Sequence, residues 1–269
     1  GNADKTTKEL KSQGIHAVSL GNNHIMDFGS RGLSDTLLAF KMSEIITFGA
    51  GENSKRAEEP LVLTVQGRRF IFFSAYWYRR YMHESFQYYA MGDYPGVACL
   101  DSDIIEYIGR EKRKDPSSFI AILPHWGQDF EFASKLQKEY AEKLIKAGAD
   151  LIIGHGAHMM QEVECVLGKW VVYSLGNGVF NSDGEYTQRS MPPYSFFGQL
   201  KINKDEVLLK LYPLHTNNLE NFWQPQPVDE EQFKHVIQII KSRGGIIGDD
   251  KSIITDHDEN GYFISVSVS

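Results

Sequence analysis

The chain has 269 residues, a formal net charge of -7 and a composition that is 42% hydrophobic and 23% charged. Such a chain can bury a substantial core, which excludes disorder as its dominant state. The acidic balance argues against a nucleic-acid backbone as the main partner, because that interaction needs clustered Lys and Arg. No apolar run approaches about 18 residues, so we expect no membrane span. Two cysteines, Cys99 and Cys165, cannot build a disulfide framework.

In the first half of the chain, helices are predicted to alternate with short apolar strands. The hydrophobic pattern predicts, in chain order, a helix over 5–13, a strand over 15–20, a helix over 31–42, a strand over 45–48, a hairpin of strands over 61–66 and 70–75, a helix over 103–112 and a strand over 119–123. Residues 76–94 are rich in Tyr and Arg but show no clear period, so we expect a surface loop or cover there.

The second half continues this alternation and adds hairpins. The pattern predicts, in order, a helix over 134–147, strands over 151–153, 162–166, 170–173, 199–202 and 206–212, a helix over 230–243 and a strand over 262–268. The last hairpin is expected to turn at 203–205, and residues 217–228 to form a loop or linker. Strands that alternate with helices indicate βαβ units and a partly parallel sheet, so the sequence predicts a layered α/β protein.

Polar side chains with imidazole or amide groups follow four of the predicted strands. They are Asn23, His24, His125, His155, His158 and Asn177. Because ligands bind beyond the carboxyl ends of strands in open α/β sheets, we expect these side chains to meet in one place. Neutral imidazole and amide oxygen bind Zn, Mn or Fe, and imidazole is also the commonest general acid or base. The pattern predicts a metal-assisted site, with Asn177 as a substrate-binding residue.

Each of these residues also has a structural interpretation. A single His after a strand is more often a hydrogen-bonded core or loop residue, and Asn23 could cap a helix or serve a turn. The histidines without matching partners are interpreted as structural: His16, His83, His215, His235 and His257. The aromatic and Arg cluster at 76–81 is interpreted as packing and cover, with binding of a sugar or an anion as the alternative.

Five motifs, in matching order and spacing between Leu10 and Leu214, resemble those of the bacterial capsule-synthesis or poly-gamma-glutamate-synthesis (CapA-type) proteins. They are 22–29 (NNHIMDFG), 49–53 (GAGEN), 125–127 (HWG), 147–158 (AGADLIIGHGAH) and 173–177 (YSLGN). The resemblance implies membership of the calcineurin-like metallophosphoesterase superfamily, with a four-layer α/β/β/α sandwich and a two-metal hydrolytic site. It also implies a place in the bacterial cell envelope.

The resemblance assigns roles to single residues. His24 matches the catalytic histidine that protonates a leaving oxygen, and we infer that Asp27 orients a neighbouring ring in this catalytic group. The implied metal ligands are Asn23, His125, His155 and His158. The expected partner is a phosphoester small molecule or an anionic or sugar polymer.

The sequence departs from the superfamily at its amino-terminal end. The superfamily has an Asp-x-His strand end and a Gly-Asp turn before the Asn-His motif, and neither occurs in residues 1–22. We therefore expect an amino-terminally truncated sandwich that lacks its first strand or strands. It is expected to form a single domain over 1–269, with 229–269 as a carboxyl-terminal extension. The open sheet edge is expected to be covered or paired by another subunit in a homo-oligomer.

The missing motifs would supply carboxylates, so the four implied ligands are all neutral. Four neutral ligands can hold one ion, but they cannot neutralise two dications about 3.5–4 Å apart. We expect one weak Mn, Zn or Fe site, or an empty one, and impaired phosphoester hydrolysis. The alternatives are a non-catalytic component that binds an anionic or sugar polymer, and a fragment whose missing segment comes from another chain.

Overall fold

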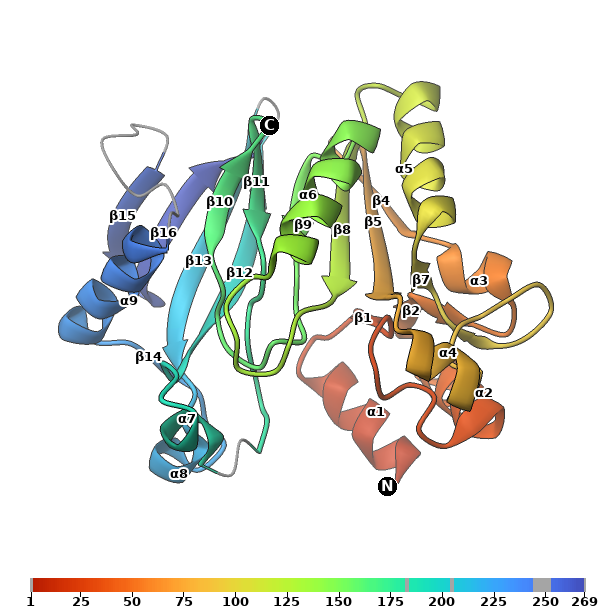
Figure 1. Cartoon of the computed structure of the whole chain (residues 1–269), viewed down its shortest axis with the longest axis horizontal. Helices are drawn as coiled ribbons and strands as arrows, with labels where there is room; N and C mark the ends of the chain where they lie inside the picture. Colours follow the sequence, from red (N-terminus) through yellow and green to blue (C-terminus); the bar gives the residue numbers. More distant parts are fainter. Residues whose placement is uncertain (1, 182–183, 204–205, 244–252, 269) are drawn as a thin grey trace. The chain divides into compact units, whose positions relative to one another are not determined.

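Figure 1 shows the computed structural model of the chain, in which the described residues are 2–181, 184–203, 206–243 and 253–268. The chain is a mixed α/β protein, as the sequence predicts. Its contacts divide it into two compact units, one of residues 1–64 and 68–125 and the other of residues 65–67 and 126–269. None of the helices in the described ranges has the length and apolar character that crossing a membrane requires. The single-domain boundaries expected from the sequence stay a prediction.

The first unit contains helices and strands from the amino-terminal half of the chain. Its helices are α1 (Ala3–Ser12), α2 (Gly29–Met42), α3 (Ser54–Glu58), α4 (Arg80–Phe86) and α5 (Ser102–Lys114). Its strands are β1 (Ala17–Ser19), β2 (Ile46–Phe48), β3 (Ala50–Gly51), β4 (Leu61–Val65, as far as residue 64), β5 (Arg68–Trp77), β6 (Gly96–Val97), β7 (Cys99–Leu100) and β8 (Phe119–His125).

The strand β5 is the centre of the main sheet in this unit. β8 pairs with it in parallel, with Phe70 opposite Phe119 at one end and Tyr76 opposite His125 at the other. β4 lies on the other side of β5, and β7 adds a short parallel pair at its end. Both β5 and β8 are almost continuously apolar and buried, which is typical of parallel strands covered on both faces. This pairing brings His125 to the carboxyl end of the sheet beside Tyr76.

Two small sheets complete the strands of the first unit. β1 and β2 pair in parallel, and β3 and β6 pair antiparallel. α2 connects β1 to β2 and buries Leu33 against Leu20 and Ala50 in a small core of its own. The loop that carries Asn23 and His24 therefore begins at a paired strand and ends at a packed helix.

The second unit follows from Trp126 onward. Its helices are α6 (Lys135–Ala147), α7 (Glu185–Gln188), α8 (Asn218–Asn221) and α9 (Glu230–Ser242). Its strands are β9 (Leu151–Ile153), β10 (Val163–Val166), β11 (Lys169–Val172), β12 (Tyr194–Ile202), β13 (Val207–His215), β14 (Gln226–Pro227), β15 (Ile253–Asp258) and β16 (Gly261–Ser267).

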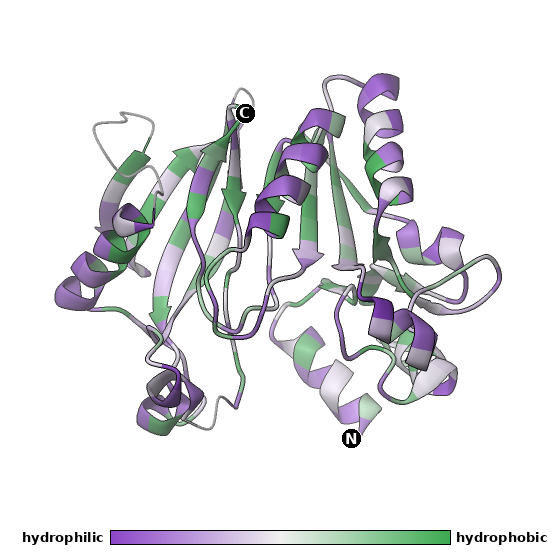
Figure 2. Ribbon diagram, viewed as in Figure 1, coloured by the Kyte–Doolittle hydropathy of each residue, from purple (hydrophilic) through white to green (hydrophobic). Residues whose placement is uncertain are grey.

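The strands of the second unit form a parallel pair with a hairpin, and a separate antiparallel sheet. β9 pairs in parallel with β11, which also forms an antiparallel hairpin with β10. β12, β13, β16 and β15 lie in that order in the antiparallel sheet, with β14 on β13. α6 and α9 begin at capping boxes, made by Ser134 with Gln137 and by Asp229 with Gln232. Figure 2 shows hydrophilic and hydrophobic residues alternating along both helices, whose buried residues include Leu144 in α6 and Val236 in α9.

The structure corrects in part the prediction of a surface loop or cover over 76–94, because most of the segment is exposed but it also contains regular structure and buried tyrosines. β5 continues to Trp77, α4 follows, and Tyr88 and Tyr89 are only 2% and 4% exposed. Tyr76, Tyr88 and Tyr89 are buried against one another, whereas Tyr78, Tyr81 and Tyr94 are exposed. The buried and exposed tyrosines follow no regular period, so the pattern could not tell them apart.

The carboxyl-terminal region also contains elements that the sequence pattern did not indicate. α8 and β14 lie in the predicted loop over 217–228, and β15 is a strand of mainly polar, exposed residues at the edge of its sheet. An edge strand of this kind lacks the apolar alternation on which strand prediction depends. The predicted turn at 203–205 lies partly outside the described residues, as do parts of the predicted extension over 229–269.

Candidate functional site

The loop between β1 and α2 presents the first pair of candidate residues. It begins at Gly21, where a Cβ would meet Ser74 Oγ at 2.3 Å and the Ala75 nitrogen at 2.8 Å. The Asn22 side chain then accepts a hydrogen bond from the backbone nitrogen of His24 (2.8 Å), which closes an Asx-turn. These contacts fix the direction in which the His24 side chain leaves the loop.

His24 and Asp27 lie in direct contact. The Nδ1 atom of His24 is 2.8 Å from Oδ2 of Asp27, and the two side chains are 68% and 47% exposed. A carboxylate at Nδ1 holds the ring in one orientation and leaves Nε2 on the side away from the carboxylate. An exposed imidazole held in this way can exchange a proton with a bound molecule.

Tyr88 anchors the same loop from a distant part of the sequence. Its hydroxyl donates a hydrogen bond to the backbone carbonyl of Asn23. Burial raises the pKa of Tyr88, and the Asp27 carboxylate adds to the effect, so the phenol stays protonated and remains a donor. Tyr76 stacks on Tyr89 and packs against Tyr88, with ring centroids 5.9 and 6.0 Å apart. The aromatic segment therefore fixes the backbone of the loop that carries His24.

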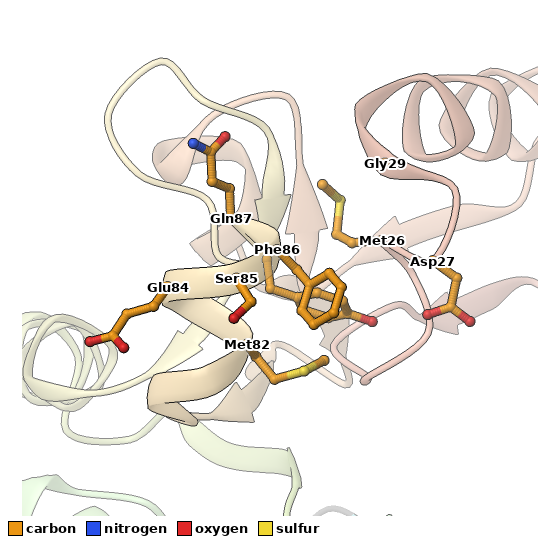
Figure 3. A pocket seen from close by; sticks show the side chains of 9 residues that line it. Met26, Asp27, Gly29, Met82, Glu84, Ser85, Phe86 and Gln87 are labelled. Atoms are coloured by element: carbon orange, nitrogen blue, oxygen red, sulfur yellow. The ribbon is translucent and has the colours of Figure 1, made fainter.

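A cavity of about 580 Å³ opens beside Asp27. Figure 3 shows Met26 and Asp27 on one side of it, with Met82 and Phe86 from the α4 segment on the other. Tyr88 also lines the cavity. A molecule bound here would contact a carboxylate on one side and sulfur and aromatic groups on the other.

His125 lies at the end of β8 in the same unit. The edge of its ring meets Tyr76, with the centroids 5.4 Å apart and the planes at 72°. Because Tyr76 also packs against Tyr88, one aromatic ring connects the end of β8 to the residue that anchors Asn23. Packing through Tyr76 thus restricts both His125 and the neighbouring aromatic segment.

The loop after β9, in the second unit, presents the other candidate histidines. It begins at Gly154, where a Cβ would meet the Tyr173 carbonyl oxygen at 2.1 Å and Trp126 Nε1 at 2.3 Å. Trp126 Nε1 donates a hydrogen bond to that same carbonyl oxygen (2.7 Å), so a larger residue would have no room between them. The Trp126 backbone nitrogen also donates to the carbonyl oxygen of His155 (2.9 Å). Further along, His158 has a left-handed φ of 62°, which is unusual for a residue with a side chain.

His158 is held by residues from three other segments of this unit. Its Nδ1 atom lies 2.9 Å from Oδ1 of Asn177. Phe130 stacks on its ring with centroids 5.6 Å apart, and Phe180 packs against it at 4.5 Å. Tyr186 donates a hydrogen bond to the His158 carbonyl oxygen (2.7 Å) and accepts one from Asn177 Nδ2 (2.9 Å). The buried Asn177 amide thus faces His158 and Tyr186, and its role in substrate binding stays a prediction.

Three supporting residues of these loops were missed by sequence reasoning: Asn22, Tyr88 and Tyr186. Asn22 had a usable signal, because an Asn two residues before a candidate His in a Gly-rich loop is a common Asx-turn. The two tyrosines had none. Tyr88 acts on a residue 65 positions away and Tyr186 on one 28 positions away, so only the folded chain brings them into place.

Residues 2–182 match the model of the family described as bacterial capsule synthesis protein PGA_cap. The matched stretch is most of the chain, and it includes the five motifs and every candidate residue. The chain belongs to this family. The resemblance to CapA-type proteins is thereby confirmed.

Relatives of the PGA_cap chain include proteins named for capsule and polymer biosynthesis. The capsule biosynthesis protein CapA of Bacillus anthracis is 30% identical over 193 residues, which are 70% of this chain and 45% of that protein. The PGA biosynthesis protein CapA of Bacillus subtilis is 28% identical over 187 residues, 69% and 48% of the two chains. A probable polyglutamine synthesis accessory protein of Mycobacterium tuberculosis is 27% identical over 248 residues, 86% and 63% of the two chains. The chain thus spans about half to just under two thirds of the length of these relatives.

The predicted metal ligands of this PGA_cap chain divide between the two units. Asn23 and His125 belong to the first, and His155 and His158 to the second, so their convergence on one ion stays a prediction. Within the described residues, no group of three or more His, Cys, Asp and Glu side chains is placed to hold a metal ion.

The chemistry of the individual donors fits a divalent ion. His158 contacts an amide oxygen through Nδ1, and metal-bound histidines usually bond an oxygen acceptor through the nitrogen that does not bind the metal. Neutral imidazole is a good ligand for Zn, Mn and Fe. His158 as a metal ligand stays a prediction that its contact with Asn177 fits.

Proposed function

We propose that this chain takes part in the synthesis of a capsule or poly-gamma-glutamate polymer of the bacterial cell envelope, and that it carries a metal-dependent phosphoesterase-type site. The observation that carries the proposal is the state of two histidines in the region matched by the family. His24 Nδ1 lies 2.8 Å from a carboxylate oxygen, and His158 Nδ1 lies 2.9 Å from an amide oxygen. Acid–base and metal-binding histidines are held in this way. The names of the relatives support the polymer.

In this proposal His24 is the general acid. Its Nε2 atom gives a proton to the leaving oxygen of a phosphoester, while Asp27 holds the ring in place through Nδ1. Tyr88 keeps the loop in place through the Asn23 carbonyl, and the cavity beside Asp27 receives part of the substrate. Asn177 contributes to substrate binding.

The proposed metal ligands are Asn23, His125, His155 and His158. A bound Mn, Zn or Fe ion would polarise a phosphoryl oxygen and activate a water molecule. Because these four ligands are neutral, we expect the chain as given to bind a single ion weakly and to hydrolyse phosphoesters slowly. In this proposal, hydrolysis is slow because the ligands carry too little negative charge to hold two metal ions, and the general acid is still present.

The proposal includes the four-layer α/β/β/α sandwich of the calcineurin-like metallophosphoesterases. It is supported by the parallel strands and helices of the first unit, and by the antiparallel sheet and α9 of the second. We also propose that a second copy covers an exposed sheet edge in a homo-oligomer.

Hydrolysis of p-nitrophenyl phosphate with added Mn²⁺, Zn²⁺ or Fe²⁺ tests the catalytic part. We expect slow, metal-dependent turnover that His24→Ala lowers about 100-fold or more. His257→Ala is a matched control, because its side chain is 72% exposed and belongs to none of the five motifs. Full activity in His24→Ala would reject His24 as the acid. Absence of turnover with all three metals would reject the hydrolase and favour the alternative, a component that binds an anionic or sugar polymer without cleaving it.

A further inference from the structure

The hydrogen bonds around His158 have a direction that can be worked out. The Tyr186 hydroxyl oxygen lies 2.7 Å from the His158 carbonyl oxygen. The same hydroxyl lies 3.2 Å from Thr216 Oγ1, which can donate to it. A carbonyl oxygen carries no hydrogen, and its contact is the shorter one, so the single hydroxyl proton of Tyr186 lies between the Tyr186 and His158 oxygen atoms.

The position of this proton fixes the orientation of the Asn177 amide. Asn177 meets the Tyr186 oxygen at 2.9 Å, on a side where Tyr186 can only accept, so the group facing it must be the donor Nδ2. The flipped amide would set two oxygen atoms against each other with no proton between them. Oδ1 of Asn177 therefore faces His158.

The amide in turn fixes the tautomer of His158. Oδ1 of Asn177 can only accept, so Nδ1 of His158, 2.9 Å away, carries the proton and Nε2 carries the lone pair of the neutral ring. Phe130 and Phe180 pack against the ring and restrict its rotation. We infer that Asn177 and Tyr186 are positioning residues that hold His158 in its Nδ1-protonated form and present Nε2 as a lone-pair donor.

This inference deepens the proposed function, on which it rests only for the identity of what Nε2 binds. The partner of His24 is a carboxylate, which lies 2.8 Å from Nδ1. The partner of His158 is a neutral amide, whose oxygen accepts from Nδ1. The two histidines are thereby prepared for different tasks, proton transfer at His24 and coordination at His158.

Long-range ¹H–¹⁵N NMR of the full chain, ¹⁵N-labelled and freed of metal with a chelator, tests the inference directly. Protonated and unprotonated ring nitrogens give well-separated signals, and the His158 signals are those absent from His158→Gln. We expect a protonated Nδ1 and an unprotonated Nε2 in the unmodified protein. A protonated Nε2, or signals averaged between the two tautomers, would overturn the inference.

Substitution of the positioning residues gives a second test. Asn177→Leu removes the acceptor, and Tyr186→Phe removes the hydroxyl that orients the amide, so each is expected to shift His158 toward averaged tautomers. Tyr194→Phe is the matched control, because it removes another buried tyrosine hydroxyl of this unit, one that lies 3.3 Å from His235 Nδ1. A folded Asn177→Leu protein with an unchanged His158 tautomer would contradict the inference. If a variant fails to fold, the measurement on the unmodified protein decides.

Addition of Mn²⁺ separates this inference from the proposed function. Selective broadening of the His158 signals would support both. An Nδ1-protonated ring that Mn²⁺ leaves unbroadened would reject the metal site and leave the positioning role intact. A His158 ring protonated at Nε2, in a protein that still hydrolyses phosphoesters with added metal, would overturn the positioning role and leave the proposed function intact.

Discussion

The loops that carry His24 and His158 both orient a histidine ring through its Nδ1 atom, but with different partners. His24 is 68% exposed, and its partner Asp27 lies three residues away in the same loop. His158 is only partly exposed and takes a left-handed backbone conformation, and its partner Asn177 lies 19 residues away. The first arrangement is largely local, whereas the second depends on tertiary structure.

This difference teaches where each histidine gets its orientation. A carboxylate in the same turn can act before the rest of the unit has packed, so the His24 pair needs little more than its loop and the Tyr88 anchor. The amide beside His158 is useful only when Tyr186 orients it. Substitutions in the second unit should therefore affect folding and function together, and those in the first loop should affect function more selectively.

The largest expected effect is on stability, at the glycine that begins the second loop. Gly154→Ala places a Cβ against the Tyr173 carbonyl oxygen and Trp126 Nε1, at 2.1 and 2.3 Å, and breaks the hydrogen bond between them. We expect a loss of about 2–3 kcal/mol in the free energy of unfolding, measured with urea. Gly21→Ala should cost less, because its nearest backbone contact, the Ala75 nitrogen at 2.8 Å, is less severe than the carbonyl oxygen at Gly154.

Gly178→Ala is the control for both glycine substitutions. Its Cβ would meet nothing within 4 Å and its φ is not left-handed, so no loss of stability is expected. Equal losses of stability for Gly154→Ala and Gly178→Ala would show that the close contacts at Gly154 do not constrain the backbone. The second loop would then not depend on tertiary packing in the way described above.

A smaller effect, confined to activity, is expected at Asp27. Asp27→Asn keeps the shape of the side chain but replaces the carboxylate at His24 with a neutral amide, the kind of partner that His158 has. We expect kcat for p-nitrophenyl phosphate to fall about 10- to 100-fold, with a smaller change in KM and an unchanged urea midpoint. Asp35→Asn, at an exposed position of α2, is the control. A rise in KM with an unchanged kcat would show that Asp27 binds the substrate and does not act through His24.

The smallest expected effect concerns charge in the antiparallel sheet of the second unit. Lys210 Nζ lies 2.8 Å from Asp258 Oδ2, and this hydrogen bond lowers the pKa of Asp258 to about 2. A lowered carboxyl pKa stabilises the fold above its ordinary value of 3.8, and the stabilisation is lost as the pH falls through about 2. Lys210→Met should therefore be slightly less stable than the unmodified protein at pH 7, with the difference shrinking between pH 4 and 2 in urea titrations. A constant difference over this range would assign the effect to packing.

The parts of the fold that sequence could predict are those whose pattern is local. The apolar run of β8 and the apolar positions of α6 indicate burial within a few residues of sequence. Both elements lie close to their predicted bounds. Tyr88 and β15 could not be predicted. The burial of Tyr88 depends on a loop 65 residues away, and β15 is a polar strand at a sheet edge.

The candidate site divides in the same way. The motif contains both His24 and Asp27, and residues three apart in a turn lie close together. Motifs also singled out His158 and Asn177, but nothing in their spacing showed that they hydrogen-bond to each other. That pairing depends on the hairpin of β10 and β11, which returns the chain to the end of β9. Tyr186 lies beyond any motif.

Tyr88 has a second role besides its support of the loop that carries His24. Its hydroxyl holds the Asn23 carbonyl, and the same side chain forms part of the wall of the cavity beside Asp27. A molecule that fills this cavity therefore touches the group that keeps the loop ordered. Linkage makes this effect reciprocal: if a bound ligand favours the ordered loop by some factor, the ordered loop binds that ligand more tightly by the same factor. One coupling free energy therefore sets both effects.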